Sequence, residues 1–167
     1  MATGQQPRGL ILIELIAVIV LVGIIASFTT FFLYSGIEGY LSTKNTNAGA
    51  LNAQMALDRI SLELKHLDYF TSFTQDSTLT FTSASEVLSG TRKLSYNSNT
   101  IWLSIGSDDY QLLEHVQPGS FRLAKSARDL DADGSDEVEY FEVGFRLNEI
   151  GRDFSTKIFP RHMVDDK

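Results

Sequence analysis

An apolar run from Leu10 to Tyr34 limits the folds that are open to this chain. Twenty of its 25 residues are Ala, Val, Ile, Leu, Phe or Tyr, and Glu14 is the only charged one. A helix of this length rises about 37 Å, which exceeds the roughly 30 Å hydrocarbon core of a bilayer. The run therefore predicts a single, somewhat tilted transmembrane helix over residues 10–34.

A cleaved secretory signal peptide is the usual alternative for an apolar run near an N-terminus. Its apolar region covers about 7–15 residues and ends at a cleavage site of small residues. The run in this chain is longer and contains an acid. Arg8 is the only charged residue ahead of the run, so the positive-inside rule predicts a cytoplasmic N-terminus and an outward-facing remainder.

The overall composition excludes some classes of function. The chain has 14 Lys and Arg residues against 21 Asp and Glu, a formal net charge of -7 and no cysteine. An acidic chain lacks the basic surface that releases counterions from phosphates, so nucleic acid is not an expected partner. Without cysteine, neither a disulfide nor a thiolate metal site can form.

Glu14 needs an explanation, because a carboxylate in a membrane helix costs roughly 2.5–3.5 kcal/mol at the bilayer centre and normally has a partner. One explanation is a position near the headgroups, where the dipole at a helix N-terminus favours an anion. This explanation does not account for the residues around it. A short leader ending in Arg8 and Gly9 precedes apolar residues, with one acid five positions after the glycine.

These residues resemble the class III signal of type IV pilins and pseudopilins, whose usual form is Gly-Phe-Thr-Leu-Ile-Glu-Leu. Five of its seven positions match, namely Gly9, Leu12, Ile13, Glu14 and Leu15. Leu10 replaces the common phenylalanine, and Ile11 replaces the threonine. The resemblance implies that a membrane-embedded prepilin peptidase cuts after Gly9 and N-methylates Leu10. It also implies that Glu14 pairs with the N-terminal amine of a neighbouring subunit, a charge-assisted contact between chains.

The residues after the run predict a weaker continuation of the helix. Glycine and asparagine, which are poor helix formers, recur between residues 35 and 50, so local bending or unwinding is expected there. From residue 50, small and apolar residues follow a 3-4-3-4-3 spacing that forms one helical stripe. The stripe comprises Ala50, Ala53, Leu57, Ile60, Leu64 and Leu67. Because it covers fewer than three heptads, packing on the chain's own sheet is favoured over a coiled coil.

Beyond residue 70 the apolar period changes to two, and turn residues separate short segments. The expected strands cover residues 78–82, 93–96, 99–105, 109–113, 120–125, 137–148 and 153–160. Phe141, Val143, Phe145, Leu147 and Trp102 are expected in the core. The sequence predicts an α+β fold, in which a long N-terminal helix with a membrane half and an amphipathic half packs on an antiparallel β-sheet domain, as in pilins.

These patterns predict four regions along the chain. They are a leader (1–9), a transmembrane helix (10–34), an amphipathic continuation of that helix (35–69) and an outer antiparallel β domain (70–167). The pilin resemblance implies a single-pass protein of the inner membrane, with a cytoplasmic N-terminus and a periplasmic C-terminal domain. The implied partners are other pseudopilins or pilins, prepilin peptidase, an inner-membrane assembly platform and membrane lipid.

The order of features also resembles the J-type minor pseudopilins of type II secretion. The similar stretches are Ala-Leu-Asp-Arg-Ile-Ser-Leu-Glu-Leu (56–64), Leu-Glu-His-Val (113–116), the acidic loop before a long strand, and Ile-Phe-Pro-Arg (158–161). The function that this implies is a structural subunit of a pilus-like filament used in protein secretion. A minor pilin of a type IV pilus or competence system is the alternative.

An acidic loop follows the expected strand 120–125. The spacing Asp129-x-Asp131-x-Asp133-Gly134 matches the first six positions of an EF-hand calcium loop. Tyr140 occupies position 12, where that loop has a bidentate glutamate. Two interpretations stay open, a calcium-binding hairpin loop and a solvated acidic turn closed by Asp-Gly. The candidate calcium ligands are Asp129, Asp131, Asp133, the Ser135 carbonyl and Glu137; no other cofactor is expected.

The sequence contains no recognisable catalytic motif. His66, His115 and His162 are dispersed, and none lies in a zinc-binding spacing such as H-E-x-x-H. There is no nucleophile elbow, P-loop or dinucleotide fingerprint either. We therefore expect a protein that is not an enzyme. The competing class is a signal-anchored envelope binding module that never assembles, and leader cleavage distinguishes it from a filament subunit.

Overall fold

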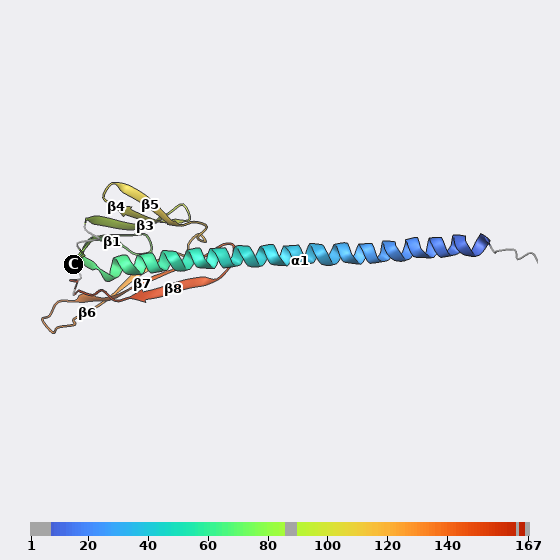
Figure 1. Ribbon diagram of the computed structural model, residues 1–167. Coiled ribbons are helices and arrows are strands. Elements are labelled where there is room, and N and C mark those ends of the chain that lie inside the picture. Colours follow the sequence, from blue (N-terminus) through green and yellow to red (C-terminus); the bar gives the residue numbers. More distant parts are fainter. Residues whose placement is uncertain (1–7, 86–89, 163, 166–167) are drawn as a thin grey trace, which may run out of the picture. The chain divides into compact units, whose positions relative to one another are not determined.

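The computed structural model describes residues 8–85, 90–162 and 164–165, with side chains of the helix described from residue 12 onward. The described residues form α1 (Arg8–Lys65), β1 (Leu67–Thr74), β2 (Thr78–Ser83), β3 (Thr91–Asn97), β4 (Thr100–Ile105), β5 (Asp108–Leu113), β6 (Arg122–Arg128), β7 (Glu137–Arg146) and β8 (Asp153–Ile158). One long N-terminal helix is followed by antiparallel strands (Figure 1), which confirms the predicted α+β class. The chain divides into two compact units, residues 1–44 and 45–167.

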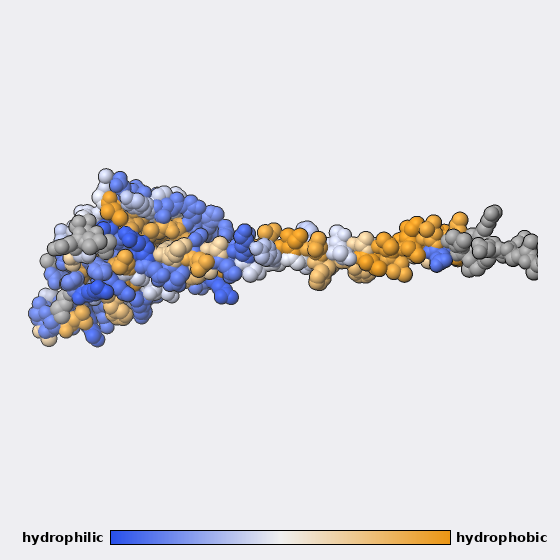
Figure 2. Space-filling model, viewed as in Figure 1, coloured by the Kyte–Doolittle hydropathy of each residue, from blue (hydrophilic) through white to orange (hydrophobic). Residues whose placement is uncertain are grey.

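In the first unit, α1 is an exposed apolar helix. Its large apolar side chains from Leu12 to Tyr34 are each at least half exposed, and they form a mostly orange surface in Figure 2. The most apolar 18-residue window has a mean hydropathy of 2.6, so the helix is long and apolar enough to cross a membrane. Hydroxyl groups of Ser27 and Thr30 donate hydrogen bonds to carbonyls one turn earlier, which satisfies these polar groups without water.

The helix is uninterrupted through residues 35–50, so the expected unwinding is not found. Gly49 has a packing role instead. A Cβ at this position would lie 2.8 Å from Cδ1 of Ile150, closer than non-bonded carbon atoms normally approach. The glycine therefore leaves room for the Ile150 side chain against the helix.

In the second unit, α1 buries four of the six residues of the predicted stripe, whereas Ala50 is half-buried and Leu67, which is buried, belongs to β1. Ala53, Leu57, Ile60 and Leu64 are at most 5% exposed, and they belong to one core with residues from both sheets.

The helix ends at Lys65, earlier than the expected residue 69. The chain then enters β1, a strand that the pattern did not predict. Its burial does not alternate and its pairing with β2 contains two register shifts, so the period-two signature is absent.

The strands form a five-stranded sheet in the order β1-β2-β3-β4-β5 and a three-stranded sheet in the order β6-β7-β8. Figure 1 shows the two sheets on either side of the green, C-terminal part of α1. The β3–β4 hairpin turns through Ser98 and Asn99, both with positive φ (51° and 64°). A two-residue turn of this kind matches the twist of antiparallel strands.

The long strand β7 confirms the predicted core residues. Phe141, Val143, Phe145 and Leu147 are at most 4% exposed. Trp102 is different, because it is half-buried, whereas its neighbours Ile101 and Leu103 are buried. Alternate side chains of a strand point to opposite faces. The expectation that Trp102 lies in the core is therefore wrong.

Candidate functional site

Glu14 lies on the exposed surface of α1, in the first unit. The apolar side chains beside it are widely exposed, with 65% for Ile13 and 61% for Leu15. Among the described side chains, none forms an ion pair or hydrogen bond with Glu14. The carboxylate is thus the only charged side chain between Leu12 and Tyr34, and no contact with another described side chain compensates it.

The expected cleavage site lies at the start of the same helix. Residues 1–7 of the leader lie outside the described residues, whereas the backbone of Gly9 and Leu10 belongs to α1. Glu14 is four residues after Leu10, which corresponds to a rise of about 6 Å, or about one helical turn. Cleavage after Gly9 would place a new amine one turn from the Glu14 carboxylate along the helix axis.

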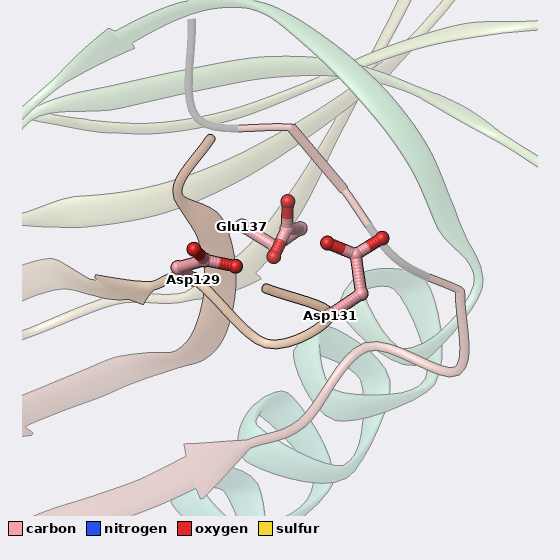
Figure 3. A group of neighbouring side chains, drawn as sticks. All are labelled: Asp129, Asp131 and Glu137. Carbon is pink, nitrogen blue, oxygen red and sulfur yellow. The ribbon is translucent and has the colours of Figure 1, made fainter. Parts of the chain in front are cut away.

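The acidic loop between β6 and β7 brings together three of the five candidate metal ligands. One carboxylate oxygen each from Asp129, Asp131 and Glu137 lies within 4.8 Å of the others, and Figure 3 shows the three side chains converging. Glu137 is only 3% exposed, and its Oε2 accepts a hydrogen bond of 2.8 Å from the amide of Leu130. The burial of Glu137 was not predicted from the sequence. The backbone of Glu137 forms an isolated antiparallel bridge with Asp165 near the C-terminus, and this long-range contact has no local sequence signal.

The Asp133 carboxylate is not part of this group of carboxylates. The Asp133 carboxylate accepts the amide N–H of Ser135 at 2.8 Å, as in a turn closed by an aspartate side chain. Asp129 accepts amide N–H groups from Ala132 and Gly134 at 2.6 and 3.1 Å. Calcium takes six to eight oxygen ligands, so the three converging carboxylates supply part of such a shell and the rest would have to come from carbonyl groups or water.

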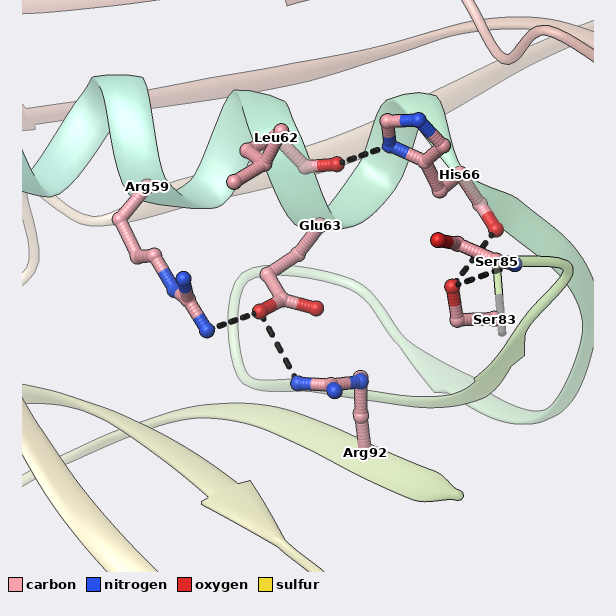
Figure 4. A network of polar contacts seen from close by, with 7 residues as sticks. All are labelled: Arg59, Leu62, Glu63, His66, Ser83, Ser85 and Arg92. Atoms are coloured by element: carbon pink, nitrogen blue, oxygen red, sulfur yellow. Dashed lines mark hydrogen bonds and ion pairs between the residues drawn. The ribbon is translucent and has the colours of Figure 1, made fainter. Parts of the chain in front are cut away.

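A second cluster of charges, which the sequence pattern did not indicate, joins α1 to β3 (Figure 4). Glu63 and Arg92 are 1% and 4% exposed, and Oε1 of Glu63 lies 3.0 Å from Nη1 of Arg92. The same oxygen lies 2.6 Å from Nη2 of Arg59, which is partly exposed. The other oxygen, Oε2, is buried without a hydrogen-bond partner among the described residues. This pair connects the helix to the sheet, and its position within the core indicates a structural role.

The three histidines lie in different surroundings. Nδ1 of His66 lies 2.9 Å from the carbonyl oxygen of Leu62 at the end of α1. This contact requires a proton on Nδ1, so Nε2 accepts a hydrogen bond from Arg161. His115 lies 2.9 Å from Glu149, and His162 is exposed.

The chain matches no protein-family model, no curated protein and no solved structure. Any conclusion about its function therefore depends on its own residues and their geometry. The features that bear on function are the helix with Gly9, Leu10 and Glu14, the acidic loop and the surfaces of the second unit.

Proposed function

We propose that this protein is a minor pseudopilin, a non-enzymatic structural subunit of a pilus-like filament used in type II protein secretion. The observation that supports the proposal is a single carboxylate, Glu14, one helical turn after the Gly9-Leu10 bond on an exposed apolar helix. A membrane anchor alone does not require that acid, and its cost in lipid opposes it. A subunit that pairs its carboxylate with another chain's amine replaces this cost with a charge-assisted contact.

The fold of the second unit is compatible with this role. A helix followed by antiparallel sheet is the architecture expected of pilin-like subunits, and the exposed apolar helix of the first unit would pack with other subunits in a filament core. In this proposal the protein is stored in the inner membrane with its β domain in the periplasm. It is then extracted and joined to sibling subunits by an inner-membrane assembly platform.

Leader processing tests the proposal directly. We expect co-expression of the full chain with a prepilin peptidase to remove residues 1–9 and add one methyl group to the amine of Leu10, as measured by intact mass. A Gly9→Val variant is expected to stay uncut, because a Cβ obstructs close approach of the catalytic groups to the backbone. An uncut wild-type chain, retained in the membrane, would instead favour an anchored binding module.

The alternative within the same class is a minor pilin of a type IV pilus or a competence system. Both alternatives predict the same processing, so they differ only in the sibling proteins that accompany the subunit. Purification of the processed chain from its native membrane, followed by identification of the pilin-like proteins bound to it, separates the two.

Calcium at the acidic loop is a separate question from filament assembly. The calcium interpretation predicts that millimolar calcium raises the melting temperature of the full chain, because a ligand at 100 times its Kd stabilises the folded state by about 2.7 kcal/mol. Asp131→Asn is expected to remove this shift, since Asp131 belongs to the converging group. Asp133→Asn is the matched control and is expected to retain it. No shift for the wild type would favour the solvated turn.

A further inference from the structure

The strand β5 ends the five-stranded sheet and leaves one edge of its backbone open. Among the strands of the described residues it pairs with β4 alone, and four of its six residues are exposed. Natural edge strands are commonly protected from pairing by lysine, proline or a covering segment. β5 has neither lysine nor proline; its protection consists of the charges of Asp108 and Asp109 at its start and a register shift in its pairing with β4, between Ile101 and Trp102.

A groove with a volume of about 620 Å³ runs beside this edge within the second unit. Five consecutive residues, 111–115, line it on one side. Gln111, Leu112 and Leu113 are the last three residues of β5, and Glu114 and His115 follow the strand. Because consecutive side chains of a strand alternate between faces, a groove that touches all three strand residues lies at the edge of the strand rather than over one face. The edge of β5 that is not paired with β4 therefore borders the groove over residues 111–113.

The opposite wall of the groove is the helix α1. Asn52, Met55 and Ala56 line this wall, and Met55 is 61% exposed. Leu113 and Leu147 also line the groove and are themselves at most 6% exposed. The groove thus offers backbone hydrogen-bonding groups along one side and apolar contacts along the other, which is the combination that holds an added strand.

The charged side chains that line the groove are acidic among the described residues. Among the described residues that line it, Glu114 and Glu149 are the acids and none is Lys or Arg. The Glu114 carboxylate lies 3.5 Å from Nε2 of His115, and the Glu149 carboxylate lies 2.9 Å from Nδ1 of the same ring. Both acids therefore contact one imidazole. An incoming segment with basic side chains would complement this charge.

The turn that carries Glu149 is held in place by a two-point contact between β7 and β8. Nε and Nη2 of Arg146 lie 2.7 and 2.6 Å from the two carboxylate oxygens of Asp153. The hydrogen bonds from Arg146 are the main cause of a lowered pKa for Asp153. The contact is therefore present at neutral pH and is lost only as the pH falls through this lowered pKa.

A second copy of this chain is a poor occupant of the groove. Pairing of β5 with another β5 in antiparallel order would bring Asp108 and Asp109 of one chain towards Glu114 of the other. Like charges on facing strands are destabilising. The acids therefore oppose self-association at this edge and favour a strand of opposite charge.

We propose that the groove between β5 and α1 is a docking site for an extended segment of a partner protein, with alternating aliphatic and basic residues, which adds to the open edge of β5 as a further strand. The inference deepens the proposed function by describing a surface for a partner of the subunit. Its test uses the single chain and needs neither leader processing nor filament assembly, so either proposal can fail alone.

The test measures binding of labelled peptides to the full chain in a neutral detergent by fluorescence anisotropy. The probe is Val-Lys-Val-Lys-Val-Lys, which has the same six-residue length as β5. We expect saturable binding with a Kd on the order of 10–100 µM, together with slower amide exchange in residues 108–113. The Val-Glu counterpart and a peptide N-methylated at every amide, which cannot pair as a strand, are expected not to bind.

Matched variants connect the binding to the groove. Glu114→Gln combined with Glu149→Gln is expected to weaken binding of the Val-Lys peptide roughly fivefold, in line with the modest strength of exposed charge pairs. Asp133→Asn combined with Asp136→Asn changes the net charge equally in the acidic loop and is expected to leave the Kd unchanged. Three results would overturn the proposal: no binding of the Val-Lys peptide, equal binding of the fully N-methylated peptide, or an unchanged Kd in the groove variant.

Discussion

Replacement of Glu14 by glutamine is expected to prevent incorporation of the subunit into filaments while leaving leader cleavage intact. In the proposed filament, the neutral amide would no longer compensate the positive amine of the neighbouring chain. Removal of one partner from a buried ion pair costs about 3–5 kcal/mol, a factor of roughly 10² to 4 × 10³ in the assembly equilibrium. The measurement is the fraction of processed subunit recovered in sheared filaments rather than in the membrane.

The size of this effect distinguishes two roles for the carboxylate. After cleavage, the amine of Leu10 in the same chain also lies about one turn from Glu14. A carboxylate that serves only its own helix terminus contributes about 0.3–1 kcal/mol, which predicts less than a tenfold change. Ser27→Ala is the control, because it changes a polar, uncharged side chain of the same apolar helix and is expected to assemble normally. Incorporation of the Glu14→Gln variant into filaments at the level of the wild type would contradict the proposed pairing between chains.

Replacement of Arg92 by methionine is expected to destabilise the second unit by about 3–5 kcal/mol. Arg92 is the buried partner of Glu63, whose Oε2 already lacks a hydrogen bond among the described residues (Figure 4). Without Arg92, the buried carboxylate keeps only the partly exposed Arg59. The measurement is thermal unfolding of the full chain in detergent, followed by near-ultraviolet circular dichroism.

Two further variants show whether the loss of stability in Arg92→Met comes from the uncompensated charge of Glu63. Glu63→Met combined with Arg92→Met is expected to recover most of the stability, because an apolar pair of similar volume often replaces a buried ion pair without cost. Arg59→Met is expected to cost less than Arg92→Met, because Arg59 is partly exposed and the buried Arg92 still compensates the Glu63 carboxylate. If Arg92→Met unfolds at the same temperature as the wild type, the pair does not stabilise the link between α1 and β3.

Most strands were predictable because their apolar residues alternate and their turns carry strong local preferences. In β7, Phe141, Val143 and Phe145 alternate with polar residues, and the structure confirms that they face the core. β1 was not predictable, since its exposed residues and register shifts depend on the partner strand β2. Trp102 was misplaced because periodicity identifies two faces of a strand without indicating which one a large aromatic residue occupies.

The candidate sites were predictable to different degrees. In the acidic loop, the spacing indicated Asp129 and Asp131 but did not reveal that the Asp133 side chain closes its own turn. Glu63 gave one clue, since it lies three residues after Ile60 on the face that the helix buries. Its partner Arg92 is 29 residues away in the chain, so no local pattern connects the two.

The sequence by itself determined the apolar helix, the place of Glu14 one turn after a Gly9-Leu10 bond, and the alternation that makes the second half of the chain a sheet. These features depend on neighbouring residues and on the fixed geometry of helices and strands. Only the tertiary structure decided which strand lies at the edge beside α1, which acids converge in the loop and which arginine reaches Glu63. Those outcomes depend on contacts between residues far apart in the chain, because packing and strand order, rather than local preference, determine them.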